Sequence, residues 1–367
     1  MGNNRIYILI VCIIALTIEG LGMELDMHKP TVLVTGGAGY IGSNTAWLLA
    51  NKGYQVVILD NMRYGQHFYP SWARVILADF ADQTILDQLF THYNVQAVMH
   101  FAGLIEVGRS GKDPSTFYQE NVAKIFNLLN KMREYQIDKF IFSSSAAVYG
   151  TPKRIPITEE DPCNPVNTYG NTKYTVEKIL QDYSHAYGLK FVALRYFNAA
   201  GADIENMLGE RHEPETHAIP LLLEAADKGE PFYIFGDDYG TPDGTCIRDY
   251  LHVKDLAVAH YKALKYLDIH KTGIFNLGTG IGVSVKELVA TVKRITGLSV
   301  EIVVQGRRDG DPDRLVADAT KANQILGWIP EYSYIETIVA DAWGFYQKKD
   351  ISMHCDSDQH CQQRSTF

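Results

Sequence analysis

Cysteine, positive charge and long apolar runs are the features that this sequence has little of. The 367-residue chain holds five cysteines, which are scattered at positions 12, 163, 246, 355 and 361 and form no Cys-x-x-Cys pair. Such a set argues against a disulfide framework or a cysteine zinc site, and it indicates reduced thiols in a cytoplasmic protein. With 34 Lys and Arg against 43 Asp and Glu, the chain also lacks the basic excess of a nucleic-acid-binding protein.

An apolar run over Ile6–Ile18 is too short to span a membrane, because a helix needs about 20 apolar residues to do so. Its length is typical of the hydrophobic part of a signal peptide. Three interpretations of residues 1–27 stay open: a signal peptide, an uncleaved membrane anchor, or an extension upstream of a true start at Met23 or Met27. Residues 348–367 are polar and aperiodic, and we interpret them as a mobile tail.

Tyr169 and Lys173 stand four residues apart, in Tyr169-Gly170-Asn171-Thr172-Lys173. On a helix they project from the same face, where the ammonium could lower the pKa of the phenol. The serine run 143–145 precedes them, and a serine at the end of a strand could hold a substrate oxygen against that phenol. With a nicotinamide, such a set can remove a hydride from a secondary alcohol. The Tyr-x-x-x-Lys pair alone is a weak signal, because most such pairs are exposed helix residues.

A glycine-rich turn lies between a predicted strand over 31–35 and a predicted helix that continues through Ala50. Gly36, Gly39 and Gly42 permit a tight turn and let the backbone approach a pyrophosphate at the helix N-terminus. A second predicted strand, 55–59, leads to Asp60, whose carboxylate can accept hydrogen bonds from a ribose and repel a 2′-phosphate. These features predict a dinucleotide site that prefers NAD to NADP.

Short apolar strands and helices continue to alternate along the chain. Further strands are expected at 75–77, 97–101 and 139–142, ending beside Asp79-Phe80, Ala102-Gly103 and the serine run. This alternation predicts an α/β fold with a Rossmann-type doubly wound parallel sheet, which binds ligands at the carboxyl ends of its strands.

The alternation becomes less regular after Asn198. We assign residues 28–198 to an NAD-binding domain and residues 199–347 to a smaller α/β C-terminal substrate-binding domain. In this second part we expect helices over 220–228 and 255–267, strands over 232–236 and 273–278, and a capped helix start at Ser284 with Glu287 three residues later.

The chain resembles the extended short-chain dehydrogenase/reductase superfamily and, within it, the UDP-glucose 4-epimerase (UDP-galactose 4-epimerase) family. The resemblance covers roughly residues 31–345. The motifs that carry it are Val34-Thr35-Gly36-Gly37-Ala38-Gly39-Tyr40-Ile41-Gly42-Ser43, Asp60-Asn61, His100-Phe101-Ala102-Gly103, Phe142-Ser143-Ser144-Ser145-Ala146-Ala147-Val148-Tyr149-Gly150, Tyr169-Gly170-x-x-Lys173, Arg195-Tyr196-Phe197-Asn198, Arg248-Asp249-Tyr250-Leu251-His252-Val253 and Arg307-Arg308-Asp309-Gly310-Asp311. The early motifs indicate the superfamily, and the later ones point to nucleotide sugars.

The resemblance implies three sets of site residues. The catalytic set is Ser145, Tyr169 and Lys173. The cofactor set is Gly36, Gly39, Tyr40, Ile41, Gly42, Asp60, Asn61, Asp79, Phe80, Phe101, Ala102, Gly103, Asn121, Tyr169, Lys173 and Tyr196. The set for the nucleotide sugar is Ser145, Tyr169, Asn198, His217, Ala218, Arg248, Arg308, Asp311 and Leu315. Arginine suits the last role, because its planar charged fork matches diphosphate oxygens.

Three places depart from the family pattern. Ile105 replaces a lysine that often contacts the cofactor, and His217-Ala218 stand where many members have Asn-Leu. Leu315 occupies the position that gates N-acetyl sugars, so the preference between hexoses and N-acetylhexosamines stays open. No metal is predicted, because we see no metal-ligand spacing in the second half. The histidines that we interpret as structural or cleft-lining are His100, His217 and His252.

The implied activity is the reversible, NAD-dependent C4 epimerisation of a UDP-sugar, UDP-glucose or UDP-galactose. Deprotonated Tyr169 would take the C4 hydroxyl proton while a hydride passes to NAD, and the hydride would return to the other face of the 4-keto sugar. A 4,6-dehydratase would need an acid–base pair where this chain has Ala146 and Ala147. Two alternatives stay open: a C4 epimerase of UDP-N-acetylhexosamine, pentose or uronate sugars, and a non-catalytic dinucleotide sensor.

The resemblance also implies a homodimer, formed through a four-helix bundle that includes the helix of Tyr169 and the helix before it. Ile125, Phe126, Leu128 and Leu129 on that preceding helix are apolar enough to take part, and core packing explains them equally well. We expect no nucleic-acid partner, and a membrane contact only if residues 1–27 are a retained anchor.

Overall fold

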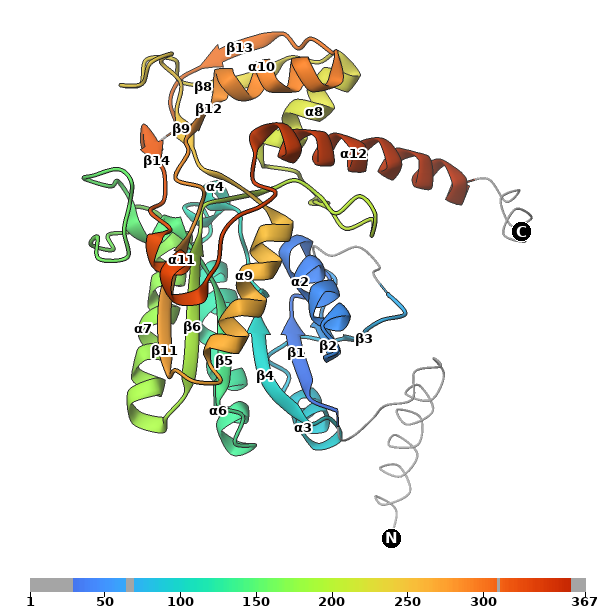
Figure 1. The fold of residues 1–367 in the computed structure, drawn as a ribbon, viewed down its shortest axis with the longest axis vertical. Helices are drawn as coiled ribbons and strands as arrows, with labels where there is room; N and C mark the ends of the chain where they lie inside the picture. Colours follow the sequence, from blue (N-terminus) through green and yellow to red (C-terminus); the bar gives the residue numbers. More distant parts are fainter. Residues whose placement is uncertain (1–28, 64–68, 309–310, 358–367) are drawn as a thin grey trace.

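The structure, a computed structural model, describes residues 29–63, 69–308 and 311–357, and side chains up to Lys348 (Figure 1). The alternative interpretations of residues 1–27 concern a segment outside these ranges. The described thiols, Cys163 and Cys246, are both free, as the composition predicts. Within the described ranges, no helix is both long and apolar enough to cross a bilayer.

A seven-stranded parallel sheet forms the centre of the molecule, in the order β11-β6-β5-β4-β1-β2-β3. Its strands are β1 (Thr31–Thr35), β2 (Gln55–Asp60), β3 (Arg74–Leu77), β4 (Val95–His100), β5 (Lys139–Ser145), β6 (Lys190–Tyr196) and β11 (Thr272–Leu277). From β1 the chain builds outwards to β3 and then returns to the other side of β1 with β4. The strand order therefore reverses between β1 and β4, which is where sheets of this kind bind ligands.

Helices cover both faces of this sheet, which confirms the predicted doubly wound fold (Figure 1). The covering helices are α2 (Tyr40–Asn51), α3 (Gln83–His92), α6 (Ile125–Glu134), α7 (Thr168–Tyr187) and α9 (Val253–Tyr266). On one face α2 and α9 bury Leu49 and Leu256, and on the other α3, α6 and α7 bury Leu86, Leu128 and Val176. Each such side chain contributes about 1.5–3 kcal/mol by leaving water, so two apolar layers hold the sheet in place.

Short helical segments connect the layers near the carboxyl ends of the strands. They are α4 (Val107–Ser110), α5 (Pro114–Tyr118), a π-helical segment (Gln119–Ala123), a 3₁₀ turn (Ala146–Tyr149) and α11 (Thr320–Leu326).

A smaller part of the molecule stands beyond the carboxyl ends of the strands, at the top of Figure 1. Its helices are α8 (Ala218–Lys228), α10 (Val285–Thr296) and α12 (Ile335–Ser357), and they share an apolar core with strand β8 (Phe232–Phe235). The remaining strands are β7 (Asn198–Ala200), β9 (Ile247–Arg248), β10 (Tyr250–His252), β12 (Val283–Ser284), β13 (Ile302–Gln305) and β14 (Arg314–Leu315).

Local sequence signals explain several element boundaries in this part. The predicted capping box is present at the start of α10, where Ser284 Oγ accepts a hydrogen bond from Glu287 N at 3.1 Å. The Glu287 carboxylate accepts one from Ser284 N at 2.7 Å in return. At the other end, α12 continues as far as Ser357 and so enters the segment expected to be a tail.

The chain crosses between the two parts more than once. Although α9 and β11 follow Asn198 in the sequence, α9 packs on the large sheet, and β11 pairs with β6 along Thr272–Leu277. The second part is therefore tied to the sheet at several points.

Candidate active site

The structure brings Tyr169, Lys173 and the serine run together at the carboxyl end of β5. Asn167 caps α7 by accepting a hydrogen bond from Gly170 N at 2.8 Å, so the helix begins one residue before Tyr169. Lys173 lies one turn further on, with only 4% of it exposed, and its Nζ donates to the Ser143 carbonyl at 2.7 Å. Ser145, the last residue of β5, lies close enough to the Tyr169 phenol for its hydroxyl to lower the phenol's pKa.

Burial controls the protonation of the two central side chains. It raises the pKa of Tyr169 to about 12, with the Ser145 hydroxyl acting against this rise, and it lowers the pKa of Lys173 to about 8. The sequence predicted that Lys173 would lower the pKa of the phenol, whereas the structure shows a net increase. The lysine Nζ faces the Ser143 carbonyl and lies 5.7 Å from the centre of the Tyr169 ring, so desolvation of the phenol dominates.

Ser110, which sequence reasoning missed, and Asn121, which it named, hold the start of α7. Ser110 Oγ accepts a hydrogen bond from Tyr169 N at 3.1 Å. Thr172 accepts one from Asn121 Nδ2 at 3.2 Å, and the Asn121 Oδ1 accepts another from Leu104 N at 2.7 Å. Asn121, which the resemblance places near Lys173, lies in the π-helical segment, a distortion that is frequent at functional sites but has no clear sequence signal.

A buried polar network, also missed, fixes α7 to β5 and β6. Glu177 on α7 accepts hydrogen bonds from Ser144 Oγ at 2.5 Å and from Arg195 Nε at 2.9 Å. Arg195 donates to the Tyr149 hydroxyl at 2.8 Å, and Tyr149 donates to Asn276 Oδ1 at 2.7 Å. Removing one partner of a buried ion pair costs about 3–5 kcal/mol, so this network fixes α7, which carries Tyr169 and Lys173, against β5 and β6.

The glycine turn after β1 has the shape that a dinucleotide needs. A Cβ on Gly36, whose φ is +70°, would lie 2.5 Å from Ala102 N, and a Cβ on Gly42 would lie 2.3 Å from the Gly36 carbonyl oxygen. Only glycine allows the backbone to pack this closely at both positions. Asp60 is held at the end of β2, where its carboxylate accepts hydrogen bonds from Ala38 N at 3.0 Å and Met62 N at 2.8 Å. This cradle fits a dinucleotide whose phosphates face the start of α2.

The other predicted cofactor residues lie around the same strand ends. Tyr40 donates to the Gly201 carbonyl at 2.6 Å, and Tyr196 contacts the Ser143 hydroxyl. The Asp79 carboxylate accepts a hydrogen bond from Lys124 at 2.6 Å, and Phe80 packs edge-on against His100. The remaining members lie in the glycine turn or directly after β2 and β4: Gly39, Ile41, Asn61, Phe101, Ala102 and Gly103.

Three of the predicted substrate residues come together on adjacent short strands. Arg248 on β9 is in register with Leu315 on β14, and its Nη2 lies 3.2 Å from Asp311 Oδ1. Asn198 is next to this group, because its N donates to the Asp249 carbonyl at 3.0 Å. The exposed Arg308 instead stacks its guanidinium over the Phe235 ring, 3.8 Å from the ring centre.

His217 and Ala218 stand at the beginning of α8. The His217 imidazole contacts the carboxylate of Glu210, and its Nδ1 lies 3.6 Å from Glu215 Oε1. Burial by itself would lower the pKa of His217, but these two carboxylates raise it to about 10.

A structural role fits the other two histidines. Burial lowers the pKa of His100 to about 3, which keeps the ring neutral, and its Nδ1 lies 2.7 Å from Thr35 Oγ1. His252 is fully buried, with its Nε2 3.1 Å from Asp341 Oδ2.

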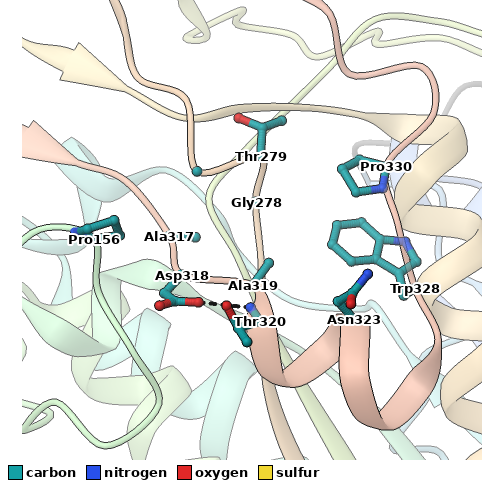
Figure 2. Close-up of a pocket in the computed structure, with 11 residues that line it drawn as sticks. Pro156, Gly278, Thr279, Ala317, Asp318, Ala319, Thr320, Asn323, Trp328 and Pro330 are labelled. Atoms are coloured by element: carbon teal, nitrogen blue, oxygen red, sulfur yellow. Dashed lines mark hydrogen bonds between the residues drawn. The ribbon is translucent and has the colours of Figure 1, made fainter.

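A cavity of about 380 Å³ lies beyond the end of β11 (Figure 2). Asp318 on its wall accepts a hydrogen bond from Thr320 N at 2.8 Å. The cavity is lined by Pro156, Gly278, Thr279, Gly280, Ala317, Asp318, Ala319, Thr320, Asn323, Trp328 and Pro330. None of these belongs to the predicted catalytic, cofactor or substrate sets, so this cavity is not the candidate active site.

Known proteins resemble this chain in sequence and in fold over most of their length. Residues 32–278 match the NAD dependent epimerase/dehydratase family. A UDP-glucose 4-epimerase of Halalkalibacterium halodurans is 47% identical over 319 residues, which cover 86% of this chain and 96% of the relative. A crystal structure of UDP-glucose 4-epimerase from Brucella ovis in complex with NAD matches with a TM-score of 0.82 and 46% identity, covering 86% and 97% of the two chains.

A crystal structure of UDP-glucose 4-epimerase from Bifidobacterium longum, in complex with NAD+ and UDP, gives a TM-score of 0.83 and 38% identity, with 87% and 99% of the chains covered. The chain belongs to the NAD-dependent epimerase/dehydratase family, and its cofactor is NAD. Within that family, the resemblance to the UDP-glucose 4-epimerases that the motifs predicted is confirmed.

Proposed function

We propose that this protein catalyses the reversible, NAD-dependent C4 epimerisation of a UDP-sugar, with UDP-glucose and UDP-galactose as its substrates. The observation that carries the proposal is the convergence of Tyr169, Lys173 and Ser145 at the end of the sheet that also bears the glycine cradle. Sequence similarity to UDP-glucose 4-epimerases over 86% of the chain supports the choice of substrate.

The chain's own residues supply the proton chemistry of this reaction. When bound, NAD supplies the acceptor that takes a hydride from the sugar C4 and returns it. Tyr169 accepts the proton of the C4 hydroxyl, and Ser145 holds that oxygen against the phenol. Because burial raises the pKa of Tyr169, proton transfer needs a nearby positive charge, which Lys173 provides. After the 4-keto sugar has turned over, Tyr169 returns the proton to the C4 oxygen.

The predicted substrate residues serve to anchor the nucleotide while the sugar turns. In this proposal Arg248 and Arg308 hold the diphosphate, and Asp311 binds the uridine ribose. The ion pair between Arg248 and Asp311 aligns both groups before substrate binds. Asn198, His217 and Ala218 complete the contacts to the nucleotide sugar.

The two assigned regions share this work between them. Residues 28–198 bind NAD, and residues 199–347 bind the UDP-sugar, with β11 of the second region joining the large sheet and α9 packing on its face. The cytoplasmic location inferred from the cysteines stays a prediction.

We also propose a homodimer that buries the outer surface of α6 and α7. Of the four apolar residues considered on α6, Ile125, Leu128 and Leu129 are buried in the core, whereas Phe126 is 40% exposed. Its ring lies 6.4 Å from that of Tyr183 on α7, and the Tyr183 ring lies 5.1 Å from that of Tyr187. These rings form an aromatic surface for a second copy of the chain.

The test of the proposed activity is to incubate the purified protein with UDP-galactose, without added NAD, and to measure UDP-glucose formation. We expect conversion, and we expect Tyr169→Phe to lower kcat by about 100-fold or more, since a general acid–base group contributes that much. UDP binding, measured by calorimetry, should stay unchanged. Tyr233→Phe, at an exposed position of β8, is the control. A wild-type rate in Tyr169→Phe would contradict the assignment.

A further inference from the structure

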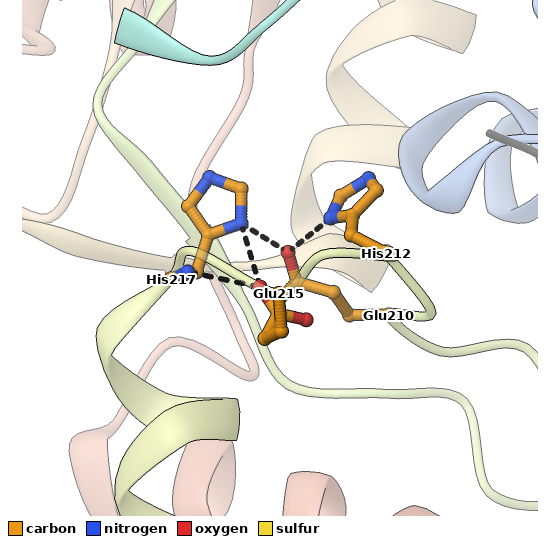
Figure 3. A group of neighbouring side chains, drawn as sticks. All are labelled: Glu210, His212, Glu215 and His217. Atoms are coloured by element: carbon orange, nitrogen blue, oxygen red, sulfur yellow. Dashed lines mark hydrogen bonds and ion pairs between the residues drawn. The ribbon is translucent and has the colours of Figure 1, made fainter. Parts of the chain in front are cut away.

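A group of ionisable side chains lies on the loop between β7 and α8, and one of its members, His217, also belongs to the predicted substrate set. No metal-ligand spacing was recognised there in the sequence. Glu210, His212, Glu215 and His217 follow the pattern Glu-x-His-x-x-Glu-x-His. One ligand atom from each, an imidazole nitrogen or a carboxylate oxygen, lies within 4.8 Å of all the others. Figure 3 shows both imidazole rings directed at the same carboxylate of Glu210.

Two distances between these atoms are near those of a tetrahedral metal site, and the direct contact between His217 Nδ1 and Glu210 Oε1 must lengthen to admit an ion. His212 Nδ1 lies 3.0 Å from Glu210 Oε1, and His217 Nδ1 lies 3.6 Å from Glu215 Oε1. A tetrahedron with bonds of about 2.0–2.2 Å has edges of about 3.3–3.6 Å. Two imidazoles and two carboxylates are donors that divalent first-row metals accept, and one divalent ion balances the charge of the two carboxylates.

Three of the four side chains are largely shielded from water, whereas that of His217 is 43% exposed. The side chains of Glu210, His212 and Glu215 are 7%, 14% and 14% exposed. The Nδ1 atom of His217 is buried. It contacts the Glu210 carboxylate but makes no aligned hydrogen bond to any described residue. Two hydrogen bonds, from Thr216 N at 2.7 Å and His217 N at 2.9 Å, fix the Glu215 carboxylate. Such outer contacts orient ligands before an ion binds.

We propose that Glu210, His212, Glu215 and His217 bind one divalent transition-metal ion, for which Zn²⁺ is the best fit. Four protein ligands leave no open position in a tetrahedral site, so the ion is structural. It holds the loop that leads into α8, and that loop is joined to α2 by the hydrogen bond from Tyr40 to the Gly201 carbonyl. The competing explanation is a pair of His–Glu ion pairs that binds no metal.

The experiment uses the purified full chain without an affinity tag, stripped with EDTA and desalted. Zn²⁺ is titrated against a chromophoric chelator, and retained metal is measured by mass spectrometry. We expect one tightly held ion per chain, and we expect Co²⁺ in place of Zn²⁺ to show the intense visible bands of a four-coordinate site. The double variant Glu210→Gln/His212→Asn should lose affinity by about 100-fold or more, because even outer-shell partners are worth 10–100-fold.

Matched controls separate this site from other metal-binding groups. Glu213→Gln, an exposed residue of the same loop, and His185→Asn, exposed on α7, should keep the ion. Replacing Cys355 and Cys361 by Ser tests the C-terminal thiols and should also leave binding unchanged.

Unchanged binding in Glu210→Gln/His212→Asn, or failure of the wild type to hold one ion, would overturn the proposal. If the double variant does not fold, the Co²⁺ spectrum of the wild type tests the proposal instead. Bands of a six-coordinate ion in that spectrum would overturn the proposed four-coordinate site.

Discussion

Burial sets the properties of Tyr169 and Lys173, the two residues at the centre of the site. Each loses solvation when it enters the fold, and the loss favours the neutral form of both. The proposed proton transfer needs the opposite arrangement, a phenolate beside an ammonium. In this proposal each side chain carries its charge in surroundings that favour its neutral form, and such perturbed groups are common at catalytic sites.

The cost of burying Lys173 predicts a pH-dependent effect on stability. Its pKa falls from 10.5 to about 8 in the fold, so between these values the unfolded chain holds the proton that the folded chain has lost, and stability rises with pH. Lys173→Met should therefore be more stable than the wild type at pH 7 by up to about 3 kcal/mol, and this gain should fade towards pH 10.5.

The measurement is urea unfolding of NAD-free protein at several pH values, since bound NAD would add its own stabilisation. Lys178→Met, at an exposed position of the same helix, is the control and should show no such pH dependence. A stability difference between Lys173→Met and the wild type that does not change with pH would rule out this explanation.

We propose that Leu315 influences which sugar the site accepts. It packs against the cluster of Val148, Tyr149 and Ile157, and Val148 and Tyr149 follow Ser145 in the chain. We expect Leu315→Tyr to lower kcat/KM for UDP-N-acetylgalactosamine relative to UDP-galactose by about tenfold or more, and Leu315→Ser to raise that ratio. Initial rates on the two sugars provide the measurement, with the exposed Ile269→Ser as the control. Equal ratios of kcat/KM for the two sugars in all variants would show that a residue other than Leu315 sets the sugar preference.

At the scale of elements, the turn between β1 and α2 depends on close backbone packing. A Cβ on Gly42 would approach the Gly36 carbonyl oxygen to 2.3 Å, so the turn must open to accept a side chain. Gly42→Ala should lower the amount of NAD that copurifies by about tenfold and destabilise the fold by about 1–3 kcal/mol.

NAD released on denaturation and the urea midpoint provide the two readouts for Gly42→Ala. Gly111→Ala is the matched control, because a Cβ there meets no atom within 4 Å and its φ is −71°. Full retention of NAD by Gly42→Ala would show that the turn tolerates a side chain and that the cradle is less tightly packed than its geometry indicates.

At the scale of the whole molecule, the aromatic surface of α6 and α7 predicts how two chains associate. Placing a charge at Phe126, which is 40% exposed, would bury an unpaired carboxylate in the proposed dimer. Phe126→Asp should therefore shift the mass measured by light scattering from dimer to monomer, whereas Ile269→Asp should not. A dimer that persists in Phe126→Asp would show that another surface joins the chains.

Some features of the site could be predicted from the sequence because they depend on local order. Gly36, Asp60 and Ser145 end or follow strands, and parallel strands place such residues along one edge of the sheet. The contributions of Ser110 and Glu177 could not be predicted, because each contacts its partner across a long stretch of chain: Ser110 meets Tyr169, and Glu177 meets Ser144 and Arg195.

The sequence by itself determined the alternation of strands and helices, the glycine turn, and the motifs that indicate a UDP-sugar epimerase. These follow from periodicity, backbone freedom and residue chemistry, which act over a few neighbouring residues. Only the tertiary structure decided that burial would raise the pKa of Tyr169, that Phe126 would stay exposed, and that His212 and His217 would converge on Glu210. Desolvation and convergence depend on which distant segments pack together, so no local pattern contains them.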